Sequence, residues 1–86
     1  MSAKFKIGDT VRYFKFPFES DEFLIVGDKN TPWQKATPYD SNSNTVEVES
    51  DKDFILLRKQ GDRYGLFGIS ENGLHVKADE IGLLNN

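Results

Sequence analysis

Apolar and polar residues alternate along much of this chain with the two-residue period of β-strands, and no window has a convincing helical period. Turn-forming residues separate the apolar runs at Gly8-Asp9, Gln60-Gly61-Asp62 and Asn72-Gly73. The pattern predicts strands over residues 10–16, 22–27, 44–49, 54–59, 63–70 and 74–77, and a last extended piece over 81–84. Residues 77–80 suit a single 3₁₀ turn. We therefore expect an all-β fold, a small antiparallel barrel of five to six strands.

Three phenylalanines at alternate positions, Phe14, Phe16 and Phe18, are the most informative feature of the sequence. On an extended strand their rings point to one face, while Val11 and Tyr13 take the opposite face. A domain this small has one core, so the second apolar face needs a partner or a second sheet to cover it. A strand that bends between the two sheets of a closed barrel would bury both faces without a partner. The sequence leaves both explanations open, and the three rings form a candidate partner-binding surface.

The Asn72-Gly73 pair predicts a two-residue type I′ hairpin turn, because both central positions of that turn need a positive φ. In the register that this turn sets, Ser70 faces His75 and Ile69 faces Val76. His75 then lies on the surface, and the inward face of the hairpin holds Phe67, Ile69, Leu74 and Val76. Extension of the same register to residues 54–66 directs Ile55 and Leu57 inward, and it directs outward Phe54, Leu56, Tyr64 and Leu66.

Residues 28–43 have the composition of one long loop, with two prolines and a polar tail. Loops of this length are uncommon in compact domains and are often functional. The stretch carries the one tryptophan of the chain, Trp33, together with Tyr39. These two rings either form a recognition platform or fold back over one end of the barrel, and both are candidate partner-binding residues.

A chain of 86 residues forms one domain, here residues 1–86, and has no room for a large active-site cavity. The absence of cysteine excludes disulfides and thiolate metal sites, and a single histidine excludes a centre with two histidine ligands. Uninterrupted apolar runs reach four residues, far short of a membrane span or the core of a signal peptide. We expect a soluble, cytoplasmic protein with no cofactor, no metal and no membrane partner.

No catalytic constellation is expected. The predicted hairpin places Ser70 beside His75 on an open strand surface, where nothing implies a pocket or an oxyanion site. Glu47 and Glu49 alternate with valines, which is typical of the solvent-exposed face of a strand. We therefore expect a protein that is not an enzyme and has no catalytic residues.

The net charge of −3 is unevenly distributed. Residues 1–18 hold four basic side chains and one acid, a local charge of +3, whereas residues 19–53 hold nine acids and three lysines, a local charge of −6. This separation could orient a charged partner, and an ordinary solvated surface would give the same composition.

Two segments resemble a known family. The opening Lys6-Ile7-Gly8-Asp9-Thr10-Val11-Arg12 and the closing Val76-Lys77-Ala78-Asp79-Glu80-Ile81-Gly82-Leu83-Leu84 are similar to segments of small bacterial and phage domains with an SH3-like barrel, including the KOW type. In that family the opening segment turns into the first strand, and the closing acidic pair lies in a 3₁₀ turn before the last strand. The resemblance implies an SH3-like barrel, from which residues 28–43 depart as an insertion. The basic surface of the ribosomal KOW members is absent here.

Two function classes fit these features. The favoured one is a small protein-binding or regulatory module, whose partner is another protein or a second copy of the chain. Its apolar anchors would be Phe14, Phe16, Phe18, Trp33 and Tyr39. The alternative is a nucleic-acid-binding protein whose aromatic rings stack on bases. Its phosphate contacts would come from Lys6, Arg12, Lys15 and Lys35, with Lys4 and Lys29 in support. A pI of about 5.0 makes this alternative less favoured, because an acidic protein must segregate its charges to bind phosphates.

Overall fold

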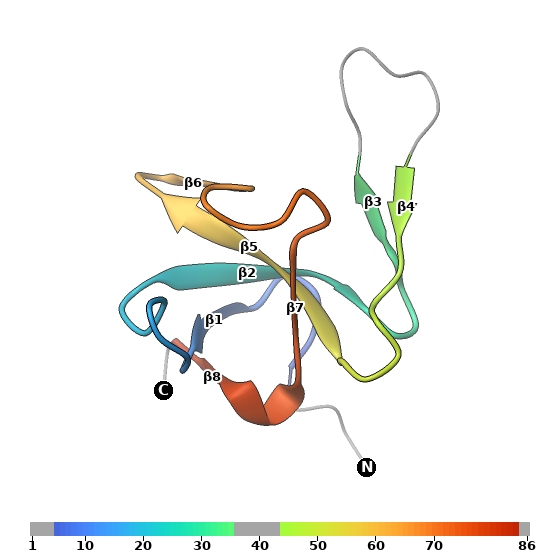
Figure 1. Ribbon diagram of the computed structural model, residues 1–86, viewed down its shortest axis with the longest axis horizontal. Coiled ribbons are helices and arrows are strands. Elements are labelled where there is room, and N and C mark those ends of the chain that lie inside the picture. The colour runs from blue at the N-terminus through green and yellow to red at the C-terminus, as the bar shows by residue number, and fades with distance from the viewer. Residues whose placement is uncertain (1–4, 36–43, 85–86) are drawn as a thin grey trace.

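The computed structural model describes residues 5–35 and 44–84, and within them eight strands form two sheets (Figure 1). The larger sheet contains β1 (Thr10–Tyr13), β2 (Glu22–Asp28), β5 (Phe54–Gln60), β6 (Arg63–Gly65), β7 (Leu74–Val76) and β8 (Ile81–Leu83). The smaller sheet pairs β3 (Trp33–Lys35) with β4 (Asn44–Val46), and a 3₁₀ helix, η1 (Ala78–Glu80), precedes β8. The predicted all-β antiparallel fold with a 3₁₀ turn is therefore confirmed.

The two long strands β2 and β5 form the centre of the larger sheet. β2 carries Phe-Leu-Ile-Val and β5 begins with Phe-Ile-Leu-Leu, and β-branched and aromatic residues suit a pleated, half-buried surface. β1 and β8 continue the sheet beyond β2. On the far edge of β5, β7 pairs with its first half and β6 with its second half. The central pair thus sets the register for every other strand of this sheet.

The inner face of the larger sheet holds the hydrophobic core. Buried and half-buried residues alternate strictly along β2, as expected for a strand with one face in the core. Tyr13, Phe18 and Leu74 pack against the edge of the core and stay half-buried. The buried members are Phe5, Val11, Phe23, Ile25, Phe54, Leu56, Val76 and Ile81.

The larger sheet does not close into a barrel. β6 and β7 lie at one edge and β8 at the other, and no ladder joins these edges in the part of the chain that the structure describes. The connection from β7 to β8 is η1, which carries the chain across the gap without pairing the strands on either side of it. The closed barrel considered from the sequence is thus replaced by an open, bent sheet.

The hairpin predicted at Asn72-Gly73 is not formed. β7 pairs with β5, so that Val76 lies opposite Phe54. Only Gly73 of the pair has a positive φ, at 83°, which excludes a type I′ turn. The N–H of Gly73 donates instead to the C=O of Ser70 (2.9 Å). Serine first and glycine fourth is the composition of a type I turn, which carries the chain into β7 without pairing β6 with it.

Because the predicted hairpin register was wrong, the two faces of β5 were also assigned the wrong way round. Phe54 and Leu56, predicted to point outward, lie in the core. Ile55, predicted to point inward, is buried on the opposite side beside Trp33 and Gly73. Of the four hairpin residues predicted to be inside, Val76 is buried, and the others are half-buried: Phe67, Ile69 and Leu74.

Three predicted strands are shorter by three or more residues in the structure, β7 and β8 each end one residue early, and one predicted loop contains a strand. β1 ends at Tyr13 rather than at residue 16, β4 at Val46 rather than at 49, and β6 at Gly65 rather than at 70. Within the predicted loop 28–43, Asp28 closes a turn by accepting N–H bonds from Asn30 (2.9 Å) and Thr31 (2.8 Å). The chain then continues into β3.

Candidate partner-binding site

The chain leaves the sheet after Tyr13 and turns back toward β2 through residues 14–18, which we call the aromatic turn. The N–H of Phe18 donates to the C=O of Lys15 (2.8 Å), and the Phe16-Pro17 peptide bond is cis. This is the arrangement of a type VI turn, with proline at its third position. Because β1 ends before this turn, the prediction that Phe14, Phe16 and Phe18 share one strand face is wrong.

The three phenylalanines have different surroundings. Phe16 at the tip of the aromatic turn is 85% exposed, and Phe14 is 58% exposed. Phe18 is half-buried, and its ring lies 6.0 Å from that of Tyr13 and 5.8 Å from that of Phe23. Phe18 therefore belongs to the edge of the core, whereas Phe14 and Phe16 remain on the surface.

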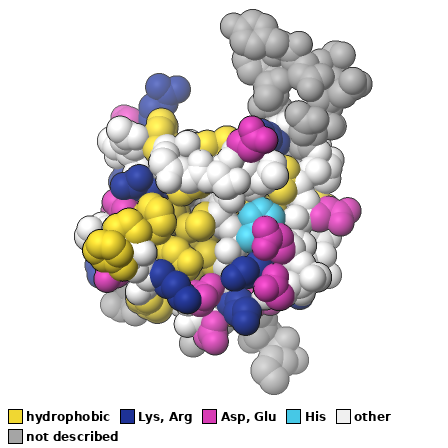
Figure 2. Space-filling model, in the orientation of Figure 1, with side chains coloured by type: hydrophobic (Ala, Val, Ile, Leu, Met, Phe, Trp, Pro, Cys, Tyr) yellow, Lys and Arg dark blue, Asp and Glu magenta, His cyan; other side chains and the backbone are white. Residues whose placement is uncertain are grey.

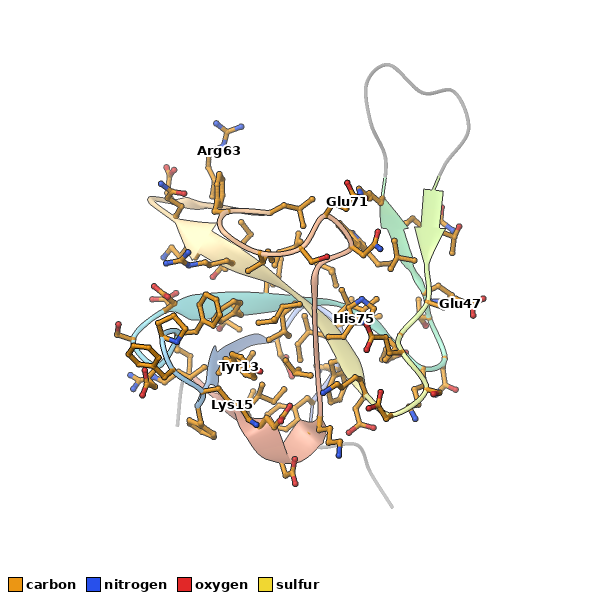
Figure 3. All side chains as sticks on the ribbon, in the orientation of Figure 1. Tyr13, Lys15, Glu47, Arg63, Glu71 and His75 are labelled. Carbon is orange, nitrogen blue, oxygen red and sulfur yellow. The ribbon has the colours of Figure 1, made fainter. Side chains whose placement is uncertain are left out.

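An ion pair holds the first half of the aromatic turn. The ammonium of Lys15 lies 3.1 Å from Oε2 of Glu80 at the end of η1, and Figure 3 shows Lys15 beside that helix. The other oxygen of Glu80, Oε1, accepts the N–H of Lys77 (2.9 Å). The N–H of Phe14 also donates to the C=O of Glu80 (3.0 Å). Glu80 thus connects the turn to the start of β8.

The charge state of the Glu80 carboxyl reflects these contacts. The backbone N–H of Lys77, and after it the ammonium of Lys15, hold the pKa of Glu80 below its usual value of 4.5. The hydrogen bond to Glu80 in turn raises the pKa of Lys15 above its usual 10.5. Both groups are therefore charged across the physiological range.

The second half of the aromatic turn is held by β5. The N–H of Asp21 donates to the C=O of Phe18 (3.0 Å), and the carboxylate of Asp21 pairs with the guanidinium of Arg58 (3.1 Å). The same guanidinium lies over the Phe18 ring, 5.4 Å from its centroid. The tip residue Phe16 is thus presented by a turn that is anchored on both sides.

Apolar side chains gather on the surface where the aromatic turn lies. Figure 2 shows them as a continuous yellow area on the side of the molecule that carries the connection from β1 to β2, with charged side chains around it. The most exposed large hydrophobic residues of the described chain are Phe16 and Phe14, followed by Ile7 and Leu83 at 39% each. Among the described residues, the aromatic turn therefore supplies both of the exposed phenylalanines.

Of the other two predicted anchors, Trp33 does not join this surface. Trp33 starts β3, away from the connection between β1 and β2 in Figure 1, and it is half-buried. Its ring lies against Gly73, where Cζ3 is 3.6 Å from the position that a Cβ would take. Trp33 thus covers the outer side of β5. Tyr39 lies outside the described residues.

The four predicted phosphate-contacting residues are spread over the molecule. Lys15 pairs with Glu80, and Nζ of Lys35 donates to the C=O of Glu71 (2.6 Å) near the other end of the fold. Lys6 and Arg12 are exposed, and their side chains make no ion pair with the described residues. Of the supporting cations, Lys29 donates to the C=O of Ser50 (3.1 Å), and Lys4 lies outside the described residues.

Ser70 and His75 do not lie side by side as the predicted hairpin required. His75 is half-buried rather than on the open surface, and Figure 3 shows it in front of β5. Nδ1 of His75 accepts the N–H of Glu49 (3.2 Å), and Nε2 lies 3.0 Å from the C=O of Asn72. Both ring nitrogens therefore have backbone partners, and the contact with Glu49 connects β7 to the segment that follows β4.

Three surface cavities, of about 500, 310 and 220 Å³, lie elsewhere on the molecule. The first two share Asp28, Lys29 and Asn30, and the third lies between Arg12 and Leu84. No ring of the aromatic turn lines any of the three. Among the described residues, no group of three or more histidine, cysteine or carboxylate side chains could hold a metal ion. In the same residues, no helix has the length and apolar character needed to cross a membrane.

The residues that anchor the aromatic turn were not singled out from the sequence. The predicted 3₁₀ turn at 77–80 placed Glu80 at a position from which a side chain can reach back to the first N–H of the turn, so this carboxylate could have been named. No comparable signal identifies Arg58. Its three partners, Phe18, Asp21 and Phe67, come from two segments that the sheet register brings together around it.

Comparison of the chain with protein-family models, with curated proteins and with solved structures found no match, so its function has to be argued from this geometry. The resemblance to SH3-like domains stays a prediction.

Proposed function

We propose that the chain is a small non-enzymatic binding module that inserts Phe16 into an apolar pocket of a protein partner. The observation that carries the proposal is the 85% exposure of Phe16 at the tip of a turn whose two halves are tied to η1 and β5. A cytoplasmic location stays a prediction from the sequence.

An anchored aromatic tip suits protein recognition for two physical reasons. Desolvation of a large apolar side chain contributes about 1.5–3 kcal/mol, which is roughly a 10- to 100-fold gain in affinity. A turn that is already ordered avoids most of the entropy cost of fixing a loop on binding. Phe16 would serve as the anchor and Phe14 as a neighbouring contact.

The surroundings of the turn favour a protein partner over a nucleic acid. Three carboxylates near it, Asp21, Glu22 and Glu80, already pair with Arg58, Lys59 and Lys15. These three cations are thus paired, and phosphate binding depends on uncompensated positive charge. An apolar anchor within balanced charges is typical of protein interfaces.

Selection of a displayed library of random dodecapeptides against the immobilised protein tests the proposal. We expect enriched peptides with a cluster of apolar residues, and we expect Phe16→Ser to abolish their binding. Ile7→Ser, at another exposed apolar residue, is the matched control and should leave binding unchanged. Equal binding to the protein and to Phe16→Ser would contradict the proposal.

Two further measurements separate the alternatives. Titration with a single-stranded oligonucleotide at about 0.15 M salt should give no signal, and salt-sensitive binding that required Arg12 and Lys6 would favour the nucleic-acid function. Sedimentation should show a monomer, and a dimer that Phe16→Ser dissociates would make a second copy of the chain the partner.

A further inference from the structure

Arg58 contacts two other segments of the chain, residues 18–21 and the connection that follows β6. Its Nη2 lies 3.1 Å from Oδ2 of Asp21, and its guanidinium carbon lies 5.4 Å from the centroid of the Phe18 ring. Its Nη1 donates to the C=O of Phe67 (3.2 Å), in the connection between β6 and β7. One side chain thus joins β5, the aromatic turn and residues 66–73.

These contacts use properties of arginine that lysine lacks. The planar guanidinium directs separate N–H groups to the carboxylate of Asp21 and the carbonyl of Phe67 while its face lies over the Phe18 ring. An ammonium group also has several N–H donors, but they sit on one compact nitrogen, without the rigid fork and planar face that the guanidinium offers to the ring. The Arg58 side chain is 31% exposed and that of Asp21 is 24% exposed, so water screens the pair only in part.

The backbone beside Phe67 is shaped to admit this side chain. A Cβ at Gly68 would stand 2.7 Å from Nη1 of Arg58, closer than side-chain atoms approach. Because Nη1 is the far end of a flexible side chain, a methyl group at residue 68 would push the guanidinium away rather than distort the sheet. The position of Arg58 therefore depends on Gly68.

We propose that Arg58 is the positioning residue of the aromatic turn and couples this turn to Phe67 and Gly68. A side chain at residue 68 that displaces the guanidinium would then make the aromatic turn, and with it Phe16, less ordered. The inference rests on the proposed function only for the consequence in binding, because the coupling itself is a property of the free protein.

Hydrogen exchange of two amides tests the coupling: that of Phe18, which closes the aromatic turn, and that of Asp21, which closes the turn after it. In Gly68→Ala we expect both amides to exchange about tenfold faster, since an ion pair and a cation–π contact are lost together. Gly61→Ala is the matched control, because Gly61 has nearly the same φ (68° against 69°) but nothing within 4 Å of a Cβ. It should strain its own turn and leave the Phe18 and Asp21 amides unchanged.

Variants of Arg58 separate positioning from general stability. Arg58→Lys should accelerate the same two amides about tenfold while amides of the β1–β2 ladder keep their rates, because lysine retains the charge without the geometry. Lys59→Gln removes the neighbouring ion pair with Glu22 (3.4 Å) and should not affect the aromatic turn. Unchanged exchange at Phe18 and Asp21 in Gly68→Ala, or equal acceleration in the ladder, would overturn the proposal.

Binding gives a second, separable readout. Peptides that require Phe16 should associate about tenfold more slowly with Gly68→Ala than with Gly61→Ala, because fewer molecules present the bound conformation. Equal association rates would remove the role of Arg58 in binding. If no peptide depends on Phe16, the proposed function fails, and the exchange measurements still decide whether Arg58 couples the two segments.

Discussion

The ring of Phe14 lies on the backbone of Gly82: a Cβ at Gly82 would stand 2.7 Å from Cζ of the ring. Gly82 is paired with Arg12 between β8 and β1. Because Gly82 has no side chain, its backbone is open to the Phe14 ring next to the end of β1. Phe14 packs on this backbone with one part of its ring and remains 58% exposed. The second exposed ring of the site thus depends on a residue at the opposite end of the chain.

Gly82→Ala is expected to move Phe14 at little cost in stability. The ring is the far end of an exposed side chain and can rotate away, so we expect a change of less than about 1 kcal/mol in the free energy of unfolding. Contacts between the Phe14 ring and residue 82, measured as nuclear Overhauser effects, should disappear. In a Phe14→Ala background the same substitution should have no further effect on peptide binding, and an additive loss would contradict this relationship.

Truncation of the two outer phenylalanines should separate the binding role from the folding role. Phe16→Ala should change the free energy of unfolding by less than about 0.5 kcal/mol, because its ring makes little contact with the core. Phe18→Ala should lower it by about 2–3 kcal/mol, since the ring packs on Tyr13 and Phe23. Chemical denaturation measures both. A large loss in Phe16→Ala would identify this ring as structural and remove the main argument for a binding site.

The sequence predicted strands better than it predicted which strands pair. β2 and β5 were located to within one residue at each end, because a central strand carries a clear run of apolar residues. Asn72-Gly73 correctly marked a turn. It did not show that β7 would pair with β5, since this pairing joins residues 18 to 22 positions apart in the chain.

The candidate site was predicted in part. The alternation of Phe14, Phe16 and Phe18 drew attention to the correct segment, but alternation is informative only where the chain is extended. Pro17 cannot donate a backbone hydrogen bond, and it was the available sign that the strand ends before this segment. Local patterns could have named Glu80 as the cap of the 3₁₀ turn. They could not predict its ion pair with Lys15 or that of Arg58 with Asp21, because ion pairs between distant segments depend on the finished register.

Separate substitution of Asn72 and Gly73 should distinguish the observed type I turn from the predicted type I′ turn. Gly73→Val should lower the free energy of unfolding by more than about 2 kcal/mol, because φ is 83° and a Cβ would stand 2.6 Å from Cγ2 of Ile55. Asn72→Val should change it by less than about 0.5 kcal/mol, since its φ is negative and its side chain is exposed. Thermal denaturation would test both. Equal losses would instead support a type I′ turn.

Acid should remove the stabilising contribution of Glu80. The folded-state pKa of this carboxyl lies below 4.5, so its contribution is complete above that value and is lost as the pH falls through the folded pKa. The difference in free energy of unfolding between the protein and Glu80→Gln should therefore shrink between about pH 5 and pH 3. Lys15→Met should retain most of this acid dependence, because the N–H of Lys77 is the larger cause. A constant difference across this range would contradict the assignment.

The role of Trp33 decides whether the hairpin of β3 and β4 is part of the fold or a free platform. Its ring lies over Gly73, and its backbone and Cβ lie 3.1–3.2 Å from where a Cβ of Gly27 would stand, so both glycines make room for it. Trp33→Ala should therefore lower the free energy of unfolding by about 2–3 kcal/mol, since the outer side of Ile55 loses its cover. Gln34→Ala, at the exposed position next to it, is the matched control and should cost less than about 0.5 kcal/mol. Trp33 emission should be shifted to shorter wavelength in the folded protein and resist acrylamide quenching. Full accessibility to acrylamide together with unchanged stability in Trp33→Ala would show that this ring is a surface platform, and the hairpin would then become a second candidate for partner binding.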